Sequence, residues 1–173
     1  FSNFVMGASR FHYSNKNSNK KMSIFYSDLT KKTTISTKKY NNVLLFNVLE
    51  HLPEYKLVFS EIYRILKRKG NFIGSVPFIY QIHGAPKDYF RFSKQFFELN
   101  LKKYGFKKIK VKPLGFGPFI ASYSLVYSYL KFIPILNQLS LLLAYILDTV
   151  IQIFVRTNLE EIFPLGYFFS AKK

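Results

Sequence analysis

The pattern of apolar and polar residues is most distinctive at Val43–Asn47, a short apolar run with the length and composition of a strand buried on both faces. An amide ends this run, and an acid and an imidazole follow closely at Glu50 and His51. Open α/β sheets bind their ligands beyond the carboxyl ends of their strands. The pattern therefore predicts a functional site at the end of this strand.

A helical pattern follows the strand and opens at Pro53. Apolar residues recur at helical spacing from Leu57 to Leu66, and charged residues fill the other face. Gly70 stands where a residue just past a helix end is expected, directly after the basic run Lys67–Lys69. We predict a single helix that reaches this glycine.

A second helix is predicted to begin after Ser93, which is a favourable N-cap residue, and to run through about Lys103. Phe97 and Leu101 would face inward, and Tyr104–Phe106 would close the helix. Strands and helices that follow one another in this way are typical of an α/β fold. The remaining strand patterns lie at Met22–Tyr26, Asn71–Val76, Lys107–Val111 and Pro164–Ala171.

A mostly apolar segment, 118–155, precedes the last predicted strand. Its longest charge-free stretch, Phe132–Leu147, contains a proline and falls short of the roughly 20 residues that a spanning helix needs. We therefore expect two helices, at about 119–131 and 135–155. They are either a buried cap on the domain or an amphipathic pair that lies on a bilayer.

Composition changes this picture only slightly. The chain has 173 residues, enough for one domain, and its formal net charge is +17. Most of the basic residues are lysines, which accompany abundant Asn, Ile, Phe and Tyr, and no nucleic-acid recognition module accompanies the charge. We expect no specific nucleic-acid partner. The absence of cysteine excludes disulfides, thiolate catalysis and cysteine-bound metals, and we predict no metal site.

Several short motifs occur in a fixed order between about Ser23 and Val111. They are Ser27–Leu29, Val48–Leu52, Glu61–Lys67 with Gly70, Ser75–Phe78, His83, Pro86, Asp88–Tyr89, Arg91 and Tyr104–Phe106. Together they resemble the middle and end of a class I S-adenosylmethionine-dependent methyltransferase, and Pro164–Lys173 is similar to the closing antiparallel strand of that family.

The resemblance implies a Rossmann-like fold and a role for individual residues. Asp28 would accept a hydrogen bond from the adenine amino group of S-adenosylmethionine, and Leu29 would contact the ring. Asn47 would lie beside the methionine part of the cofactor, and Glu50 would follow near the transferable methyl group. Alternatively, Asp28 caps a turn, and Glu50 and His51 cap the following helix.

The loop from Pro77 to Arg91 would lie on the substrate side. Methyl transfer needs alignment of the two reactants, and a base where the acceptor must lose a proton. Either His51 or His83 could be that catalytic base, because imidazole titrates near neutral pH. The predicted substrate-binding residues are Tyr80, Asp88, Tyr89 and Arg91, although Asp88 and Arg91 could instead form a structural pair that fixes the loop.

Two elements of the family pattern are not found. The only glycine before Gly70 is Gly7, so no Gly-rich turn is present, and Asp28 is the first acid, so no earlier residue could bind the ribose hydroxyls. We expect residues 1–173 to form a single partial domain that lacks the first strand, the Gly-rich turn and the second strand of the fold. Such a chain would not bind the cofactor tightly alone.

Two functions remain open at this point. The first is methyl transfer from S-adenosylmethionine to a small-molecule, glycan or lipid-linked acceptor, in the cytoplasm, with this chain as the C-terminal part of the enzyme. The alternative is an inactive, degenerate methyltransferase-fold protein. In that case the Lys-rich body and the apolar segment 118–155 would attach it peripherally to anionic membrane surfaces.

Overall fold

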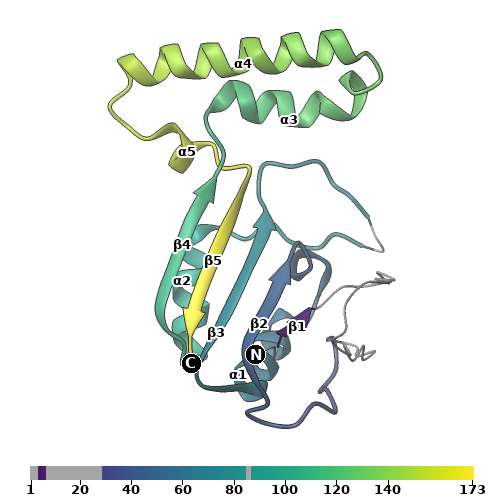
Figure 1. The fold of residues 1–173 in the computed structure, drawn as a ribbon, viewed down its shortest axis with the longest axis vertical. Helices are drawn as coiled ribbons and strands as arrows, with labels where there is room; N and C mark the ends of the chain where they lie inside the picture. The colour runs from purple at the N-terminus through teal and green to yellow at the C-terminus, as the bar shows by residue number, and fades with distance from the viewer. Residues whose placement is uncertain (1–3, 7–28, 85–86) are drawn as a thin grey trace, which may run out of the picture.

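The computed structural model describes residues 4–6, 29–84 and 87–173. They form a mixed five-stranded sheet with two helices on one face and a helical hairpin beyond one end of the sheet (Figure 1). The strand order is β1-β2-β3-β5-β4. The strands are β1 (Phe4–Met6), β2 (Tyr40–Phe46), β3 (Leu66–Pro77), β4 (Lys107–Leu114) and β5 (Gly166–Lys172), and the helices are α1 (Tyr55–Ile65), α2 (Lys94–Lys103), α3 (Pro118–Leu130), α4 (Pro134–Phe154) and α5 (Leu159–Ile162).

The direction of the strands determines which loops meet. Strands β1, β2 and β3 are parallel, so the carboxyl ends of β2 and β3 lie at the same edge. Strand β5 runs antiparallel to both β3 and β4. The hairpin of α3 and α4 lies beyond this same edge (Figure 1). The loops after β2 and β3 therefore leave the sheet at the edge that faces the hairpin, and the loop after β3 contacts α3 through Gln81 and Ser128.

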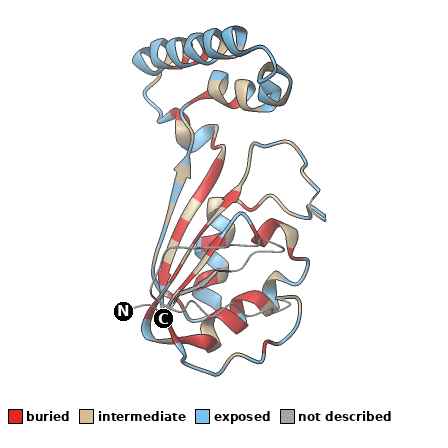
Figure 2. Ribbon diagram, turned by 45° about the vertical axis from the view of Figure 1, so that its right-hand side comes forward, coloured by how far each residue is buried: buried red, intermediate tan, exposed pale blue. Residues whose placement is uncertain are grey.

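The core is largely aromatic and lies between the sheet and the helices α1 and α2 (Figure 2). Phe59 of α1 and Phe97 of α2 are fully buried against Phe72 and Phe169 of the sheet. The Phe97 and Phe169 rings stack with their centroids 4.4 Å apart. Each such side chain removes enough apolar surface from water to stabilise the fold by a few kcal/mol.

Several predicted elements are confirmed. Ser93 is the N-cap of α2, where its hydroxyl accepts a hydrogen bond from the Phe96 amide. Gly105 ends that helix with φ +89°, a conformation that glycine adopts without steric cost. The two predicted apolar helices are α3 and α4.

The predicted end of the first helix is wrong. Helix α1 ends at Ile65, and Lys67–Lys69 lie in β3 rather than in a last helical turn. Leu66 is fully buried and pairs with Tyr40 of β2, so the chain leaves the helix early to place Leu66 in the core. Gly70 is required for another reason, since a Cβ there would lie 2.8 Å from the Lys67 carbonyl oxygen and 2.9 Å from that of Asn41.

Strand β2 also differs from the prediction that both of its faces are buried. Val43 and Leu45 are buried on the helix side, whereas Phe46 on the other side is 45% exposed. In the described part of the chain, the helices that pack on the sheet, α1 and α2, cover a single face of it (Figure 1), and Val43 and Leu45 belong to the core that these helices form with the sheet. Strand β1, which pairs with β2, was not expected, and the strand predicted at Met22–Tyr26 lies outside the described residues.

The helical hairpin is mostly exposed, so it is not a buried cap. Ala121 and Ala144 are buried where α3 and α4 touch, and Asp148 of α4 is fully buried there. Its two carboxylate oxygens accept hydrogen bonds from the amides of Phe119 (2.9 Å) and Ile120 (2.8 Å) in the first turn of α3. This carboxylate satisfies amides that a helix start leaves without an intrahelical partner.

Candidate active site at the carboxyl ends of β2 and β3

The site begins where β2 ends. Asn47 has φ +49°, and its backbone N–H donates to the Ser75 carbonyl of β3 (2.9 Å), which holds the two strand ends together. The Ser75 hydroxyl also donates to Asn47 Oδ1 (3.0 Å). A 3₁₀ turn, Leu49–His51, follows with the Leu49 side chain fully buried. The buried leucine fixes the turn, and the turn directs Glu50 and His51 toward the loop after β3.

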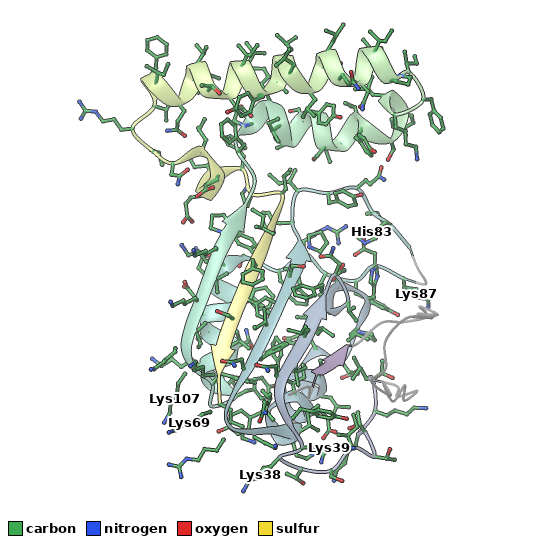
Figure 3. All side chains as sticks on the ribbon, viewed as in Figure 1. Lys38, Lys39, Lys69, His83, Lys87 and Lys107 are labelled. Atoms are coloured by element: carbon green, nitrogen blue, oxygen red, sulfur yellow. The ribbon has the colours of Figure 1, made fainter. Side chains whose placement is uncertain are left out.

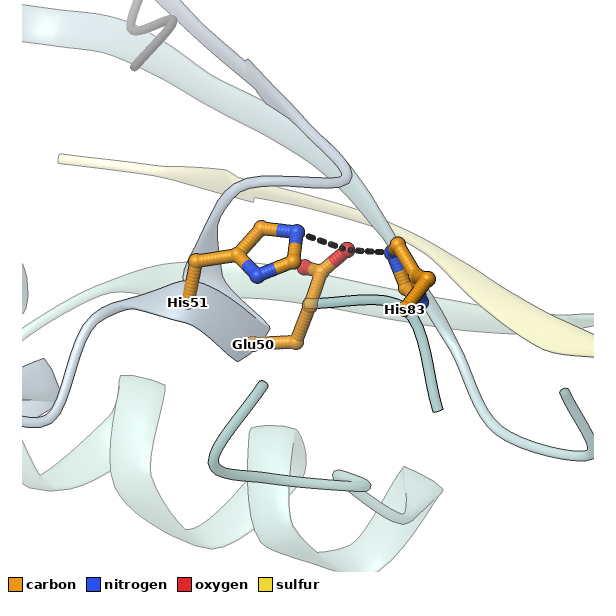
Figure 4. Close-up of side chains that lie close together, drawn as sticks. All are labelled: Glu50, His51 and His83. Atoms are coloured by element: carbon orange, nitrogen blue, oxygen red, sulfur yellow. Dashed lines mark ion pairs between the residues drawn. The ribbon is translucent and has the colours of Figure 1, made fainter. Parts of the chain in front are cut away.

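Glu50, His51 and His83 come together at this edge (Figure 4). Glu50 Oε1 lies 3.7 Å from His51 Nε2 and 3.8 Å from His83 Nε2. The two imidazole rings are nearly perpendicular, with centroids 4.9 Å apart. From the sequence, Glu50 was expected to bind the cofactor, and His51 and His83 were separate candidates for a base. The structure places all three side chains in one cluster.

The Glu50 carboxylate is fully buried, and neither oxygen has a hydrogen-bond partner among the described residues. Burial raises its pKa above the usual value, and the neighbouring His51 and His83 offset part of that increase. Most buried polar groups in proteins have a hydrogen-bond partner, so an unpartnered carboxylate requires a specific explanation.

The remaining nitrogen of each imidazole is bound by another group. His51 Nδ1 lies 2.6 Å from the Lys87 carbonyl oxygen, which can only accept, so Nδ1 carries the proton. His83 Nδ1 lies 3.2 Å from Asp88 Oδ2. Both contacts favour the tautomer in which Nε2 has a free lone pair, and in both rings Nε2 is the atom nearest Glu50.

Asp88 and Arg91 form the ion pair that the structural alternative expected. Arg91 Nη2 donates to Asp88 Oδ2 (2.7 Å) and to the Gln81 carbonyl (3.2 Å). The hydrogen bond from Arg91 holds the pKa of Asp88 at about 2. Asp88 also accepts from the His83 amide (3.1 Å), so the pair fixes the loop around His83. Substrate binding by Asp88 and Arg91 stays a prediction.

Two predicted substrate residues are accessible at the surface of the loop. Tyr80 is 43% exposed and packs edge-on against the His83 ring, with centroids 5.4 Å apart. Tyr89 is 45% exposed, and its backbone N–H donates to the backbone carbonyl of Glu50 (2.8 Å). These tyrosines therefore lie close to the cluster and retain free surface for a ligand.

The cofactor residues predicted from the resemblance are only partly described. Asp28 lies outside the described residues. Leu29 is half-buried and packs against the core. Asn47 is exposed at the end of β2, and its side-chain amino group has no hydrogen-bond partner among the described residues. Cofactor binding by Leu29 and Asn47 stays a prediction, and the predicted contact of Asp28 with adenine is not described.

The contacts that hold the loop after β3 in place were not predicted from the sequence. Gln81 Nε2 donates to the Ser128 hydroxyl of α3 (2.9 Å), which ties the loop to the hairpin. The Lys87 carbonyl positions His51. These partners lie 47 and 36 residues apart in the chain, so no local pattern could reveal them.

Comparison with known proteins gives a consistent assignment. Residues 8–74 match the family model of a methyltransferase domain. No curated protein sequence matches the chain significantly. Solved structures of S-adenosylmethionine-dependent methyltransferases resemble it at 15% sequence identity, a level at which the likeness concerns the fold.

Three solved structures illustrate this likeness. Phosphoethanolamine N-methyltransferase 2 of Haemonchus contortus, solved with phosphomonomethylethanolamine and S-adenosylhomocysteine, has a TM-score of 0.51, with 84% of this chain and 36% of that chain covered. A methyltransferase of Archaeoglobus fulgidus has a TM-score of 0.55, with 88% and 68% covered. A putative sarcosine dimethylglycine methyltransferase of Galdieria sulphuraria, also 15% identical, has a TM-score of 0.53, with 86% and 58% covered. These findings confirm the methyltransferase-like fold, and the match of residues 8–74, less than half of the chain, adds a partial resemblance to the family.

Proposed function

We propose that this chain, which has the fold of the class I S-adenosylmethionine-dependent methyltransferases, carries the acceptor side of a methyl-transfer site. The observation that carries the proposal is the cluster of Glu50, His51 and His83 at the carboxyl ends of two adjacent parallel strands. Ligands of open α/β sheets bind at this edge. The acceptor would be a small molecule, a glycan or a lipid-linked group, and Tyr80 and Tyr89 would contact it.

The cofactor, S-adenosylmethionine, supplies an electrophilic methyl group when it is bound. Asn47 would hold its methionine part through the side-chain amino group, which has no hydrogen-bond partner among the described residues. His51 and His83 each present an unprotonated Nε2 that could accept a proton from an acceptor hydroxyl or amine. Arg91 and Asp88 would keep the loop, and with it His83, in place for this step.

The first experiment measures cofactor binding by the 173-residue chain. In an NMR titration with S-adenosylmethionine we expect weak binding, with shifts concentrated around Asn47 and Glu50. Asn47→Ala should weaken it. Asn42→Ala is the matched control, because Asn42 also lies on β2 and accepts a side-chain hydrogen bond from β3, through Asn71 (2.8 Å), but lies away from the carboxyl end.

Two results would contradict the proposal. Shifts that avoid the carboxyl ends of β2 and β3 would place the cofactor elsewhere. If Asn47→Ala and Asn42→Ala weakened S-adenosylmethionine binding equally, the carboxyl end of β2 would have no special role in binding it. Separately, micromolar binding by this chain would contradict the expectation that it holds only part of the cofactor site.

A second function, peripheral attachment to a membrane, rests on the exposed hairpin. Helix α4 has 21 residues and is long and apolar enough by composition to cross a membrane, with only 11% of its most apolar window buried. Leu139 and Leu143 are 58% and 57% exposed. We propose that this face of the hairpin lies in the interface of a bilayer and brings the site close to lipid-linked acceptors.

The arrangement of charge refines the membrane alternative. Lys38, Lys39, Lys69 and Lys107 lie at the end of the sheet that is opposite the hairpin (Figure 3). A flat membrane in contact with α4 would not reach these lysines at the same time. We therefore expect attachment through apolar contact rather than through the Lys-rich body, with little dependence on salt.

Vesicle co-sedimentation tests this expectation. The chain should bind phosphatidylcholine vesicles, and binding should persist in high salt. The double variant Leu139→Glu and Leu143→Glu should lose binding. Gln138→Glu is the control, since it places a charge at an exposed polar position of the same helix. Binding that requires anionic lipid and disappears in salt would favour the lysines and refute attachment through the hairpin.

A further inference from the structure

We propose that Glu50, His51 and His83 form a binding site for one divalent transition-metal ion, for which zinc is the best match. The sequence analysis predicted no metal site, because the three ligands are not recognisable from local spacing. The site is inferred from its geometry, from the groups behind the ligands and from the unpartnered carboxylate. It does not depend on methyl transfer.

The geometry fits an ion between the three side chains. Glu50 Oε1, His51 Nε2 and His83 Nε2 converge in Figure 4, and one ligand atom from each residue lies within 4.8 Å of the other two. Zinc bonds of about 2.0–2.2 Å at tetrahedral angles place neighbouring ligand atoms ~3.4 Å apart. The separations of 3.7 and 3.8 Å from the carboxylate oxygen need only a small contraction on binding. The ligand atoms of the two histidines, which lie within 4.8 Å of each other, would have to approach by up to about 1.4 Å.

The groups behind the two histidines are those that metal-binding histidines use. His51 donates Nδ1–H to the Lys87 carbonyl, and His83 Nδ1 contacts the Asp88 carboxylate. Such contacts orient the ring and leave Nε2 available to a metal. Arg91 in turn holds Asp88. Both imidazoles are thus held with Nε2 close to the same carboxylate oxygen of Glu50.

The Glu50 carboxylate is an independent observation that points to a ligand. It is fully buried, and both oxygens lack a hydrogen-bond partner among the described residues. Burial of an unpaired carboxylate is unfavourable unless a cation or hydrogen bonds compensate it. A metal ion bound to Oε1 would provide this compensation.

The ligand types decide which ions fit. Two imidazoles and one carboxylate suit zinc and other first-row transition metals, whereas magnesium and calcium prefer an all-oxygen set. Three protein ligands leave a tetrahedral position open. With an ion bound, both Nε2 atoms would be ligands, and neither histidine could act as the base of the proposed methyl transfer. An acceptor oxygen in the open position would instead lose its proton more readily through the metal. This consequence rests on the proposed function, whereas metal binding itself does not.

The test uses the full chain after removal of metal with EDTA. Titration with ZnCl₂ by calorimetry should give one ion per chain. Co²⁺ should give the visible absorption bands of a four-coordinate site with nitrogen ligands. Glu50→Gln, His51→Asn and His83→Asn should each remove the Co²⁺ bands, and Asp88→Asn should weaken zinc binding about 10-fold or more.

The control is His12→Ala, which removes the remaining histidine of the chain. This variant should bind zinc as the parent chain does. Circular dichroism establishes that each variant is folded, and Glu50→Gln preserves the size of the buried side chain. Zinc binding that is unchanged by all three ligand substitutions, or that is lost in His12→Ala, would overturn the proposal. Methyl transfer without metal would leave the metal site standing as long as zinc binds, so the two failures are distinguishable.

Discussion

Among the described residues, the carboxylates of Glu50 and Asp148 are fully buried, and they differ in what surrounds them. Asp148 in the hairpin accepts two backbone hydrogen bonds at the start of α3. Glu50 at the sheet edge has no hydrogen-bond partner among the described residues and faces two imidazoles. Equal burial therefore accompanies two different roles. The first carboxylate completes the fold, and the second is arranged for a ligand.

The difference follows from where the two groups lie. Asp148 lies between the two helices of the hairpin, and its hydrogen bonds join α4 to the start of α3. Glu50 lies in the 3₁₀ turn after β2, and Leu49 beside it is fully buried, so the backbone holds the carboxylate in place. A group that the fold positions without hydrogen bonds is available for chemistry. Four predictions, from the largest expected effect to the smallest, test this comparison.

The largest effect is expected from Asp148→Ala. Removing the carboxylate leaves the amides of Phe119 and Ile120 without a partner, and two hydrogen bonds to a charged acceptor are lost. We expect the hairpin to lose about 3 kcal/mol of local stability. Hydrogen exchange of these two amides measures the loss.

The neighbouring Thr149 provides a control for Asp148→Ala. Its hydroxyl donates to the Tyr145 carbonyl within the same helix, and the residue is exposed. Thr149→Ala should change the stability of the hairpin by no more than about 0.5 kcal/mol. Unchanged exchange of the Phe119 amide in Asp148→Ala would show that the carboxylate does not hold the hairpin.

The second prediction concerns Glu61, a buried carboxylate that has its partner beside it. Arg64 Nη2 donates to Glu61 Oε2 (2.8 Å) and, with the Thr33 amide, lowers the pKa of Glu61 to about 2. The contribution is present above the unfolded pKa of about 4.5 and is lost as pH falls through about 2. The full shift of the Glu61 pKa corresponds to about 3 kcal/mol, and solvent screening at the partly exposed Arg64 reduces this contribution to about 2 kcal/mol. Glu61→Gln should flatten the loss of stability in urea denaturation between pH 5 and 2, whereas the exposed Glu98→Gln should not.

The outcomes for these residues show what the sequence could predict. The apolar run of β2 and the Ser93 cap are local patterns, so they predicted their elements correctly. The end of α1 was wrong because Leu66 is drawn into the core by its pairing with Tyr40, a tertiary contact. The function of Asp148 was hidden because its partner amides lie 28 and 29 residues away.

The site was predictable to a similar extent. Glu50 and His51 are adjacent in the chain, so their place after β2 was evident from the sequence. His83 was a candidate by residue type, but nothing local places its Nε2 beside Glu50. That placement depends on the loop contacts of Gln81 and Arg91, which join the loop to α3 and to Asp88. Long-range contacts of this kind require the structure.

The third prediction concerns Gly117, which lies directly against Asp148. A Cβ at this position would lie 2.5 Å from the Asp148 carboxyl carbon, so Gly117→Ala should destabilise the hairpin by about 1–2 kcal/mol. In the Asp148→Ala background the added methyl group has space, and its cost should nearly disappear. The parent chain, Gly117→Ala, Asp148→Ala and the double variant form a double-mutant cycle, which thermal unfolding and hydrogen exchange measure. Additive effects would mean that the close approach is not what requires the glycine.

The smallest effect, and the one of opposite sign, is expected from Glu50→Gln. An amide of the same size carries no charge into the buried position, so in EDTA at pH 7 this variant should be more stable than the parent chain by up to about 1 kcal/mol. Asp148→Asn should instead be less stable, because an amide can replace only one of the two accepted hydrogen bonds. With zinc in excess, the parent chain should gain stability by mass action while Glu50→Gln does not, so the order of the two reverses. Thermal unfolding of the three chains in both buffers measures these differences. Destabilisation by Glu50→Gln in EDTA would mean that the carboxylate already has a partner in the folded chain, and the contrast with Asp148 would no longer hold.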